Sequence, residues 1–351
     1  MPPCQRPVLI AVVLGVLLLG GPAIGQDRFP GAEWAQVPAV QAGWSEAGLA
    51  QAQDWSRQIN STAVMVIQHG VVAAEWGDTV KRTELASVRK SLLSALVGIA
   101  VAAKQIDLNS TLAQLGIDDN PPSLTDAEKQ ATVRMLLQAR SGVYHVALYE
   151  TAGEVAKRPA RGSHPPGTFW YYNNWDFNAL GTIYEHATGA GIYDALDRLI
   201  ARPIGMQDYR PQDGAYVVGA ASIHRAYPLR MSARDLARFA LLYLHGGMWA
   251  GRQVVPTAWV RESTQSYSHS AAGTGYGYLW WTESIGDRRH SGMVLPAGSF
   301  YAMGAGGQYA FVIPAHDLVV VNRVDRDRHL PEPKPSMVAE LLRLIFAAGG
   351  F

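Results

Sequence analysis

The pattern of apolar and polar positions divides the chain into sheet-forming ends and a helical middle. The stretch TAVMVIQHGVVAAEWGD (Thr62–Asp78) is rich in β-branched residues and predicts two strands joined by a turn at His69-Gly70. The next run, Ser87–Ala103, is apolar on nearly every side, which predicts a buried helix. That run is too short to span a bilayer, which needs roughly 20 residues.

The central part of the chain favours helices and loops. Residues 161–167 (RGSHPPG) form a loop, and Ser232 and Gly246 are a suitable N-cap and stop for one of the helices. The predicted helices are a run opening at 124–126 and continuing through 132–139, a helix over 178–189 that ends in glycine, and a helix over 232–247.

Strand character returns near the C-terminus. Segments 275–281, 308–314 and 318–324 are rich in β-branched and aromatic residues, and a last helix is expected over about 335–346. Sheet-forming segments therefore come from both ends. We predict a discontinuous α/β lobe (about 40–104 and 275–351) with an inserted helical lobe (about 105–274) and a cleft where they meet.

The N-terminus has the features of a secretory signal. Arg6 precedes an apolar run at Val8–Gly20, and Ala23-Ile24-Gly25 offers a small-residue cleavage site. We expect cleavage before Gln26, giving an exported protein, periplasmic or secreted, without stable membrane insertion. An uncleaved N-terminal anchor is the alternative.

Composition excludes several classes of function. The chain of 351 residues is 48% hydrophobic and 17% charged, as in globular proteins, and its net charge of +1 does not suggest a nucleic-acid partner. The only cysteine, Cys4, lies in the signal segment, so we expect no disulfide and no thiolate metal site. The sequence also lacks His-Glu-x-x-His, Gly-x-Ser-x-Gly and phosphate-loop motifs, and we expect no metal or cofactor.

Ser87 and Lys90 open the buried helix and are candidates for nucleophile and base. Residues three apart share one face of a helix, so a neutral Lys90 amine could take the Ser87 proton for acyl transfer. Burial would lower the pKa of the lysine toward that role, and the Ser87 amide could donate to an oxyanion. The alternative is that both residues are only the polar start of a helix.

A second candidate element is an aromatic loop before a helix, PGTFWYYNNWDFNALG (Pro166–Gly181). The pattern Tyr-x-Asn occurs there twice, as Tyr171/Asn173 and Tyr172/Asn174. A tyrosine hydroxyl can share proton transfer with a lysine, and an asparagine amide can bridge a lysine and a substrate amide. The alternative is a loop that packs its rings into the core.

Together these elements resemble the serine β-lactamase and penicillin-binding protein superfamily, on the class C and esterase side, over roughly residues 40–345. Ser87-Val88-Arg89-Lys90 matches the S-x-x-K motif. The spacing from Pro166-Gly167 and from Leu180-Gly181 selects Tyr172 over Tyr171 as the catalytic tyrosine. The resemblance implies an α/β (α+β) fold with an antiparallel sheet flanked by helices and an all-helical inserted lobe. It also implies that Asn174 positions Lys90 and the substrate.

The third motif of the family, Lys-Thr-Gly, is missing. Counting back from Pro314 puts Ala302-Met303-Gly304 in its place, while His290-Ser291-Gly292 lies too far upstream. Ala302 cannot hold a substrate carboxylate as the family's lysine does. The resemblance places Gly304 and Ala305 beside the substrate, with the Ala305 amide completing the oxyanion hole.

These residues lead to three functional hypotheses. The first is a serine hydrolase that cleaves esters or small amides, with Ser87, Lys90 and Tyr172 catalytic and His145 a possible substrate contact. The second is a cell-wall peptidase or β-lactamase acting on a peptide-like substrate, which would need another cation, for example Arg323. The third is a non-catalytic binding module on the same fold.

Overall fold

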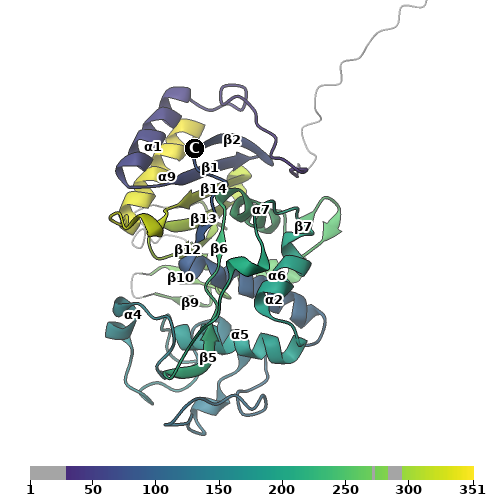
Figure 1. The fold of residues 1–351 in the computed structure, drawn as a ribbon, viewed down its shortest axis with the longest axis vertical. Coiled ribbons are helices and arrows are strands. Elements are labelled where there is room, and N and C mark those ends of the chain that lie inside the picture. The colour runs from purple at the N-terminus through teal and green to yellow at the C-terminus, as the bar shows by residue number, and fades with distance from the viewer. Residues whose placement is uncertain (1–28, 271–272, 284–294) are drawn as a thin grey trace, which may run out of the picture.

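The computed structural model describes residues 29–270, 273–283 and 295–351, and an eight-stranded antiparallel sheet forms its centre (Figure 1). The strand order is β2-β1-β14-β13-β12-β11-β10-β9. The strands are β1 (Ala63–Gln68), β2 (Val71–Gly77), β9 (Ser268–His269), β10 (Gly275–Tyr276), β11 (Trp281–Thr282), β12 (Phe300–Gly304), β13 (Gln308–Ile313) and β14 (Leu318–Arg323).

The two ends of the chain meet inside this sheet, as predicted. β1 pairs with β14 along its whole length, from Ala63 opposite Arg323 to Gln68 opposite Leu318. Every residue of β1, β13 and β14 is buried, so both faces of the central strands are covered. The turn between β1 and β2 falls at His69-Gly70, and both residues have positive φ.

Helices cover the two faces of the sheet. Helix α7 (Ala233–Leu244) packs on β1, β13 and β14. The first and last helices, α1 (Glu46–Gln58) and α9 (Pro335–Gly349), lie side by side away from α7 (Figure 1). Their contact is so close that a Cβ on Gly48 would lie 2.8 Å from the Ala348 Cβ.

The inserted segment surrounds helix α2 (Arg89–Ala102), which follows a 3-10 turn, η1 (Ala86–Val88). Helices α5 (Asn174–Thr188), α6 (Ile192–Leu196) and α8 (Thr257–Ser263) pack on α2. The remaining helical elements are α3 (Val133–Leu137), α4 (Ala152–Lys157), η2 (Glu128–Gln130), the π-helical η3 (Asp197–Ala201), η4 (Pro211–Asp213), η5 (Pro314–His316) and η6 (Arg326–Arg328).

The insertion is not purely helical, which corrects one detail of the prediction. Its short strands pair with one another and do not join the eight-stranded sheet. They are β4 (Val217–Gly219) with β5 (Ser222–Ala226) and β7 (Met248–Trp249) with β8 (Arg252–Gln253), and a further pair joins β3 (Thr83–Glu84) to β6 (Arg230–Met231).

Two other predicted elements differ. Segment 275–281 is two short strands around a tight turn rather than one strand, and 124–139 contains only η2 and α3. The predicted signal segment lies outside the described residues. Within the described ranges, no helix is both long and apolar enough to cross a membrane.

Candidate active site

Ser87 lies in the 3-10 turn η1, between strand β3 and helix α2. The residue before it, Ala86, has a φ of 47°, a left-handed conformation that costs a non-glycine residue energy. The end of strand β12 approaches this turn closely. A Cβ on Gly304 would lie 2.9 Å from the Ser87 nitrogen and 2.5 Å from the Leu85 carbonyl oxygen, so only glycine fits there.

Lys90 lies one turn above Ser87. Its Nζ is 2.8 Å from the Ser87 Oγ and 2.8 Å from the Tyr172 hydroxyl, and the side chain is 1% exposed. Burial, reinforced by the charge of Arg89 and opposed by Glu154, lowers the pKa of Lys90 well below its ordinary value. A lysine in this environment can serve as a neutral amine base.

Tyr172, and not Tyr171, reaches Lys90. The Lys90 Nζ lies 4.5 Å from the centroid of the Tyr172 ring as well as beside its hydroxyl. Tyr171 turns the other way and donates its hydroxyl to the Glu154 carbonyl at 2.8 Å. Burial, together with the charge of Glu154, raises the pKa of Tyr172, so its hydroxyl keeps its proton at neutral pH.

Asn174 is the first residue of α5 and comes two positions after Tyr172, but its contacts are different. Its Nδ2 donates to the Tyr149 carbonyl at 2.8 Å and to Glu154 Oε2 at 3.3 Å. Its Oδ1 is buried and accepts no hydrogen bond from the described part of the chain. The expected bond between Asn174 and Lys90 is absent from the hydrogen bonds of the described residues.

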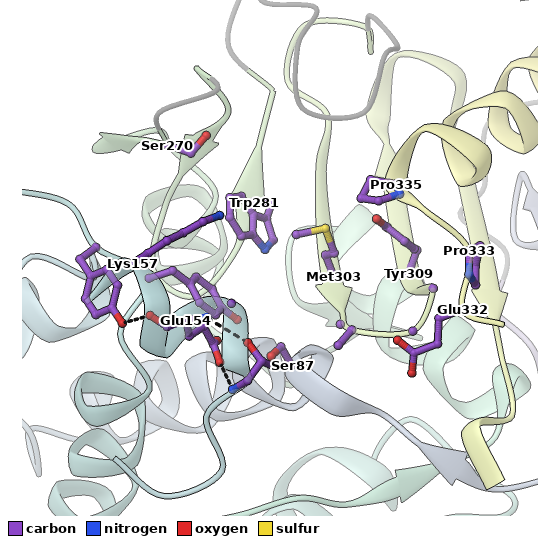
Figure 2. A pocket seen from close by; sticks show the side chains of 18 of the residues that line it. Ser87, Glu154, Lys157, Ser270, Trp281, Met303, Tyr309, Glu332, Pro333 and Pro335 are labelled. Carbon is purple, nitrogen blue, oxygen red and sulfur yellow. Dashed lines mark hydrogen bonds between the residues drawn. The ribbon is translucent and has the colours of Figure 1, made fainter. Parts of the chain in front are cut away.

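Ser87 faces a cavity of about 640 Å³. Figure 2 shows Ser87 between two groups of lining residues, with Glu154 and Lys157 on one side and Tyr309 and Glu332 on the other. Aromatic rings form much of the wall. Tyr172 stacks on Trp281 with ring centroids 5.6 Å apart, and Trp170 meets Trp281 edge to face at 6.0 Å.

The turn after β12 forms another part of the lining, which includes Gly304 and Ala305. Gly306 and Gly307 follow with φ values of 80° and 85°. A Cβ on Gly307 would lie 2.6 Å from Pro333 Cγ. The turn is therefore packed tightly, and Ala305 lines the same cavity as Ser87.

His145 does not line this cavity, and its predicted role as a substrate contact is corrected. It is 8% exposed, with Nδ1 3.0 Å from the Val146 carbonyl and Nε2 3.0 Å from the Asn120 carbonyl. Asp119 is also close, at 3.5 Å. The ring is thus part of a buried polar cluster in the insertion.

Arg323 does not offer a cation to a substrate either. It is 1% exposed at the end of β14, and its guanidinium donates to the carbonyls of Met231 and Thr83 and to Gln308 Oε1 at 2.7–3.0 Å. Burial lowers its pKa to about 9. Ala302 is buried and carries no charge. Among the described lining residues, Lys157 is the single cation. The rejected match His290-Ser291-Gly292 lies outside the described residues.

Two residues near the site were not singled out from the sequence. Glu154 lines the cavity and belongs to a capping box with Thr151 at the start of α4; the pattern Thr-x-x-Glu was the available signal. Arg89 occupies a variable position of the S-x-x-K motif, so the motif gave no reason to choose it. No cluster of three or more potential metal ligands occurs within the described ranges.

Comparison with known proteins identifies the family of this chain. The model of the β-lactamase family matches residues 46–333. Esterase EstB of Burkholderia gladioli is 29% identical over 146 residues, covering 35% of this chain and 37% of the esterase. An uncharacterized protein of Alkalihalophilus pseudofirmus is 23% identical over 255 residues, covering 68% of this chain and 71% of that protein.

Solved structures share the fold at low identity. A Bacillus anthracis protein assigned as a 6-aminohexanoate-dimer hydrolase superposes with a TM-score of 0.66 at 18% identity, covering 90% of this chain and 86% of that one. A β-lactamase from Mycobacterium bovis gives 0.63 at 21% identity, covering 87% and 100%. The sequence match spans every candidate residue from Ser87 to Ala305, and we conclude that this chain belongs to the β-lactamase family, a family of hydrolases.

Proposed function

We propose that this protein is an exported serine hydrolase that cleaves an ester or small amide through an acyl-enzyme on Ser87. The observation that carries the proposal is the position of Lys90, buried and 2.8 Å from both Ser87 Oγ and the Tyr172 hydroxyl at the base of an aromatic cavity. A polar helix start without a catalytic role gives no reason to bury an amine there.

The pKa of Lys90 is lowered and that of Tyr172 is raised, so the two side chains take different proton transfers. Lys90, whose pKa is lowered by burial, accepts the Ser87 proton as the Oγ attacks the carbonyl carbon. Tyr172, whose pKa is raised by burial, stays protonated and can pass a proton to the leaving group while Lys90 replaces it. Water then attacks the acyl-enzyme by the reverse route and frees Ser87.

The oxyanion of the tetrahedral intermediate needs donors close to the Ser87 nitrogen. We assign this role to the backbone amides of Ser87 and Ala305, since strand β12 ends against the serine turn and Ala305 lines the same cavity. Backbone donors do not depend on the missing Lys-Thr-Gly side chains.

The lining favours a substrate without a carboxylate near the scissile bond. The position of the family's cation is Ala302, and the guanidinium of Arg323 is bonded to the protein itself. The aromatic wall of Trp170, Tyr172 and Trp281 suits an apolar acyl or alcohol group. We therefore place ester or small-amide cleavage ahead of β-lactam or D-amino-peptide cleavage.

The test is intact mass after incubation with a fluorophosphonate, followed by peptide mapping. We expect one adduct, on Ser87, and its loss in Ser87→Ala together with all turnover of p-nitrophenyl esters. Ser91→Ala is the matched control, because Ser91 lies four residues after Ser87, in helix α2, and its buried hydroxyl donates to the Leu279 carbonyl.

An Ser87→Ala variant that keeps full activity would contradict the proposal. A folded wild-type protein that gives no adduct and hydrolyses neither esters nor amides would favour the binding-module hypothesis. Faster turnover of a chromogenic cephalosporin than of any ester would favour the β-lactamase hypothesis.

Export rests on the sequence of residues 1–25 alone. N-terminal sequencing of the protein recovered from its native host should begin at Gln26. Recovery of a chain that still carries Val8–Gly20 would instead support an N-terminal anchor.

A further inference from the structure

Arg89 is a buried charge that the chemistry above does not use. Its side chain is 1% exposed, and no ion pair with a carboxylate is present among the described residues. One nitrogen, Nη1, donates to the Ala86 carbonyl at 2.9 Å, while Nε and Nη2 have no hydrogen-bond partner within the described ranges. Isolated burial of a cation is costly, so a compensating role is expected.

Two aromatic rings hold the guanidinium in place. Its Cζ lies 5.0 Å from the centroid of the Tyr149 ring and 5.2 Å from that of Tyr227. The face of an aromatic ring attracts a cation but carries no net charge. Unlike a carboxylate, it therefore does not neutralise the cation. With the bond to Ala86, these contacts hold an unneutralised positive charge on the buried residue that precedes Lys90 in the chain.

The other groups that act on the Lys90 amine are few. Tyr172 lies beside it, with Tyr276 behind that ring at 6.0 Å, and Tyr227 lies against Arg89. Their pKa values are raised by burial, so all three are neutral. Among the described residues, Glu154 is the single carboxylate that opposes Arg89 at Lys90. The charges that act on the Lys90 amine are thus one buried cation, Arg89, and one partly exposed carboxylate, Glu154.

We propose that Arg89 is a positioning residue whose fixed, buried charge keeps the neighbouring Lys90 amine unprotonated and so ready to accept the Ser87 proton. The inference rests on the proposed function for its catalytic meaning. Arginine suits this role better than lysine, because a guanidinium stays charged when buried whereas an amine would lose its own proton.

The direct test is the titration of Lys90 by NMR in protein labelled with ¹³Cε-lysine, the resonance being assigned by its loss in Lys90→Met. Two neutral variants are compared with the wild type. Arg89→Met removes charge and hydrogen bond together, while Arg89→Gln can still donate to the Ala86 carbonyl. Both should raise the Lys90 midpoint by on the order of one pH unit, as expected for loss of a nearby unit charge.

Tyr227→Phe is the matched control, since it keeps the ring over Arg89 and removes only a hydroxyl that has no partner in the described structure. It should leave the midpoint within a few tenths of a unit. Glu154→Gln should move the midpoint down, because the Glu154 charge favours protonated Lys90.

The second readout is the pH dependence of Ser87 labelling by the fluorophosphonate. Its acid limb should move up with the NMR midpoint, so that labelling at neutral pH falls about tenfold in both neutral variants and recovers at higher pH. A shift with Arg89→Met alone would assign the effect to the hydrogen bond and overturn the proposal. No shift in either variant, or an equal shift with Tyr227→Phe, would also overturn it.

The two proposals fail in different ways. A charge-dependent Lys90 midpoint in a protein that gives no Ser87 adduct and hydrolyses neither esters nor amides would contradict the acyl-enzyme while supporting the action of Arg89 on Lys90. An adduct on Ser87 with an unchanged Lys90 midpoint in the neutral variants would support the acyl-enzyme and contradict the action of Arg89 on Lys90.

Discussion

At the scale of single residues, the burial of Lys90 lowers the stability of the folded protein when the amine is protonated. An amine that is 1% exposed gives up hydration, and its lowered pKa means that the folded protein binds this proton more weakly than the unfolded chain does. Between the lowered pKa and the unfolded value of about 10.4, the unfolded state therefore holds more protons, and stability rises with pH.

Lys90→Met should remove this dependence. We expect the variant to be more stable than the wild type at acid and neutral pH, and the difference to shrink by about 1.4 kcal/mol per pH unit as pH rises through that window toward 10.4. Urea unfolding at a series of pH values measures it. Parallel stability curves for the two proteins would contradict a lowered Lys90 pKa.

Residue types and spacing singled out Ser87 and Lys90, which lie at a short helix start, and the family resemblance selected Tyr172 over Tyr171 in the aromatic loop. They could not predict the surroundings of His145 or Arg323. Both have chemistry suited to a site, but their partners, such as Asp119 and Met231, come from distant segments whose proximity depends on the tertiary fold.

At the scale of elements, the end of strand β12 against the serine turn is the critical contact. Gly304→Ala would place a methyl 2.5 Å from the Leu85 carbonyl oxygen, so the strand and the turn must separate. A displacement of about 1 Å at a reacting group can reduce turnover roughly 100-fold, and we expect a loss of that size in kcat/KM for a p-nitrophenyl ester.

Gly153→Ala is the control for this prediction. Gly153 lines the same cavity, but its added Cβ would have no neighbour closer than the Thr151 Oγ1 at 4.0 Å. It should keep activity within about twofold. Equal activity in the two variants would mean that the approach of β12 to Ser87 does not matter.

The sequence predicted helices and strands correctly where the apolar pattern was long. It failed where a tight turn interrupts a segment of strand composition. Strands β1, β13 and β14 and helix α7 were expected near their observed bounds. Segment 275–281 has strand composition, yet Gly277 donates to the Trp280 carbonyl at 2.8 Å and Leu279 has a φ of 64°. A Cβ on Gly277 would lie 2.2 Å from the Ser263 carbonyl oxygen, a crowding set by α8 that local composition cannot reveal.

At the scale of the whole molecule, Asp119 joins separate parts of the insertion. Its carboxylate accepts from Trp175 Nε1 at 2.7 Å, from the Ile223 amide at 2.8 Å and from the Ser222 hydroxyl. Burial acts to raise the pKa of Asp119, but these hydrogen bonds outweigh it and the pKa is lowered.

Asp119→Ala should therefore destabilise the protein by about 2–4 kcal/mol at neutral pH, because several buried donors lose their acceptor. The lowered pKa makes this contribution complete above the unfolded value of about 3.9 and reduces it as pH falls through the folded pKa. Urea unfolding should show the two proteins converging in acid. Asp54→Ala, which breaks an exposed pair with Arg57, is the control and should cost less than about 1 kcal/mol.

The pairing of β1 with β14 also has a consequence for synthesis of the chain. Ser87 and Lys90 leave the ribosome early, but the strand β12 that approaches Ser87 and the strand β14 that completes the centre of the sheet are made only after residue 300. The sheet must close a loop of more than two hundred residues, which is a slow step in folding. The surroundings of Ser87 are thus incomplete in the growing polypeptide until translation is nearly finished.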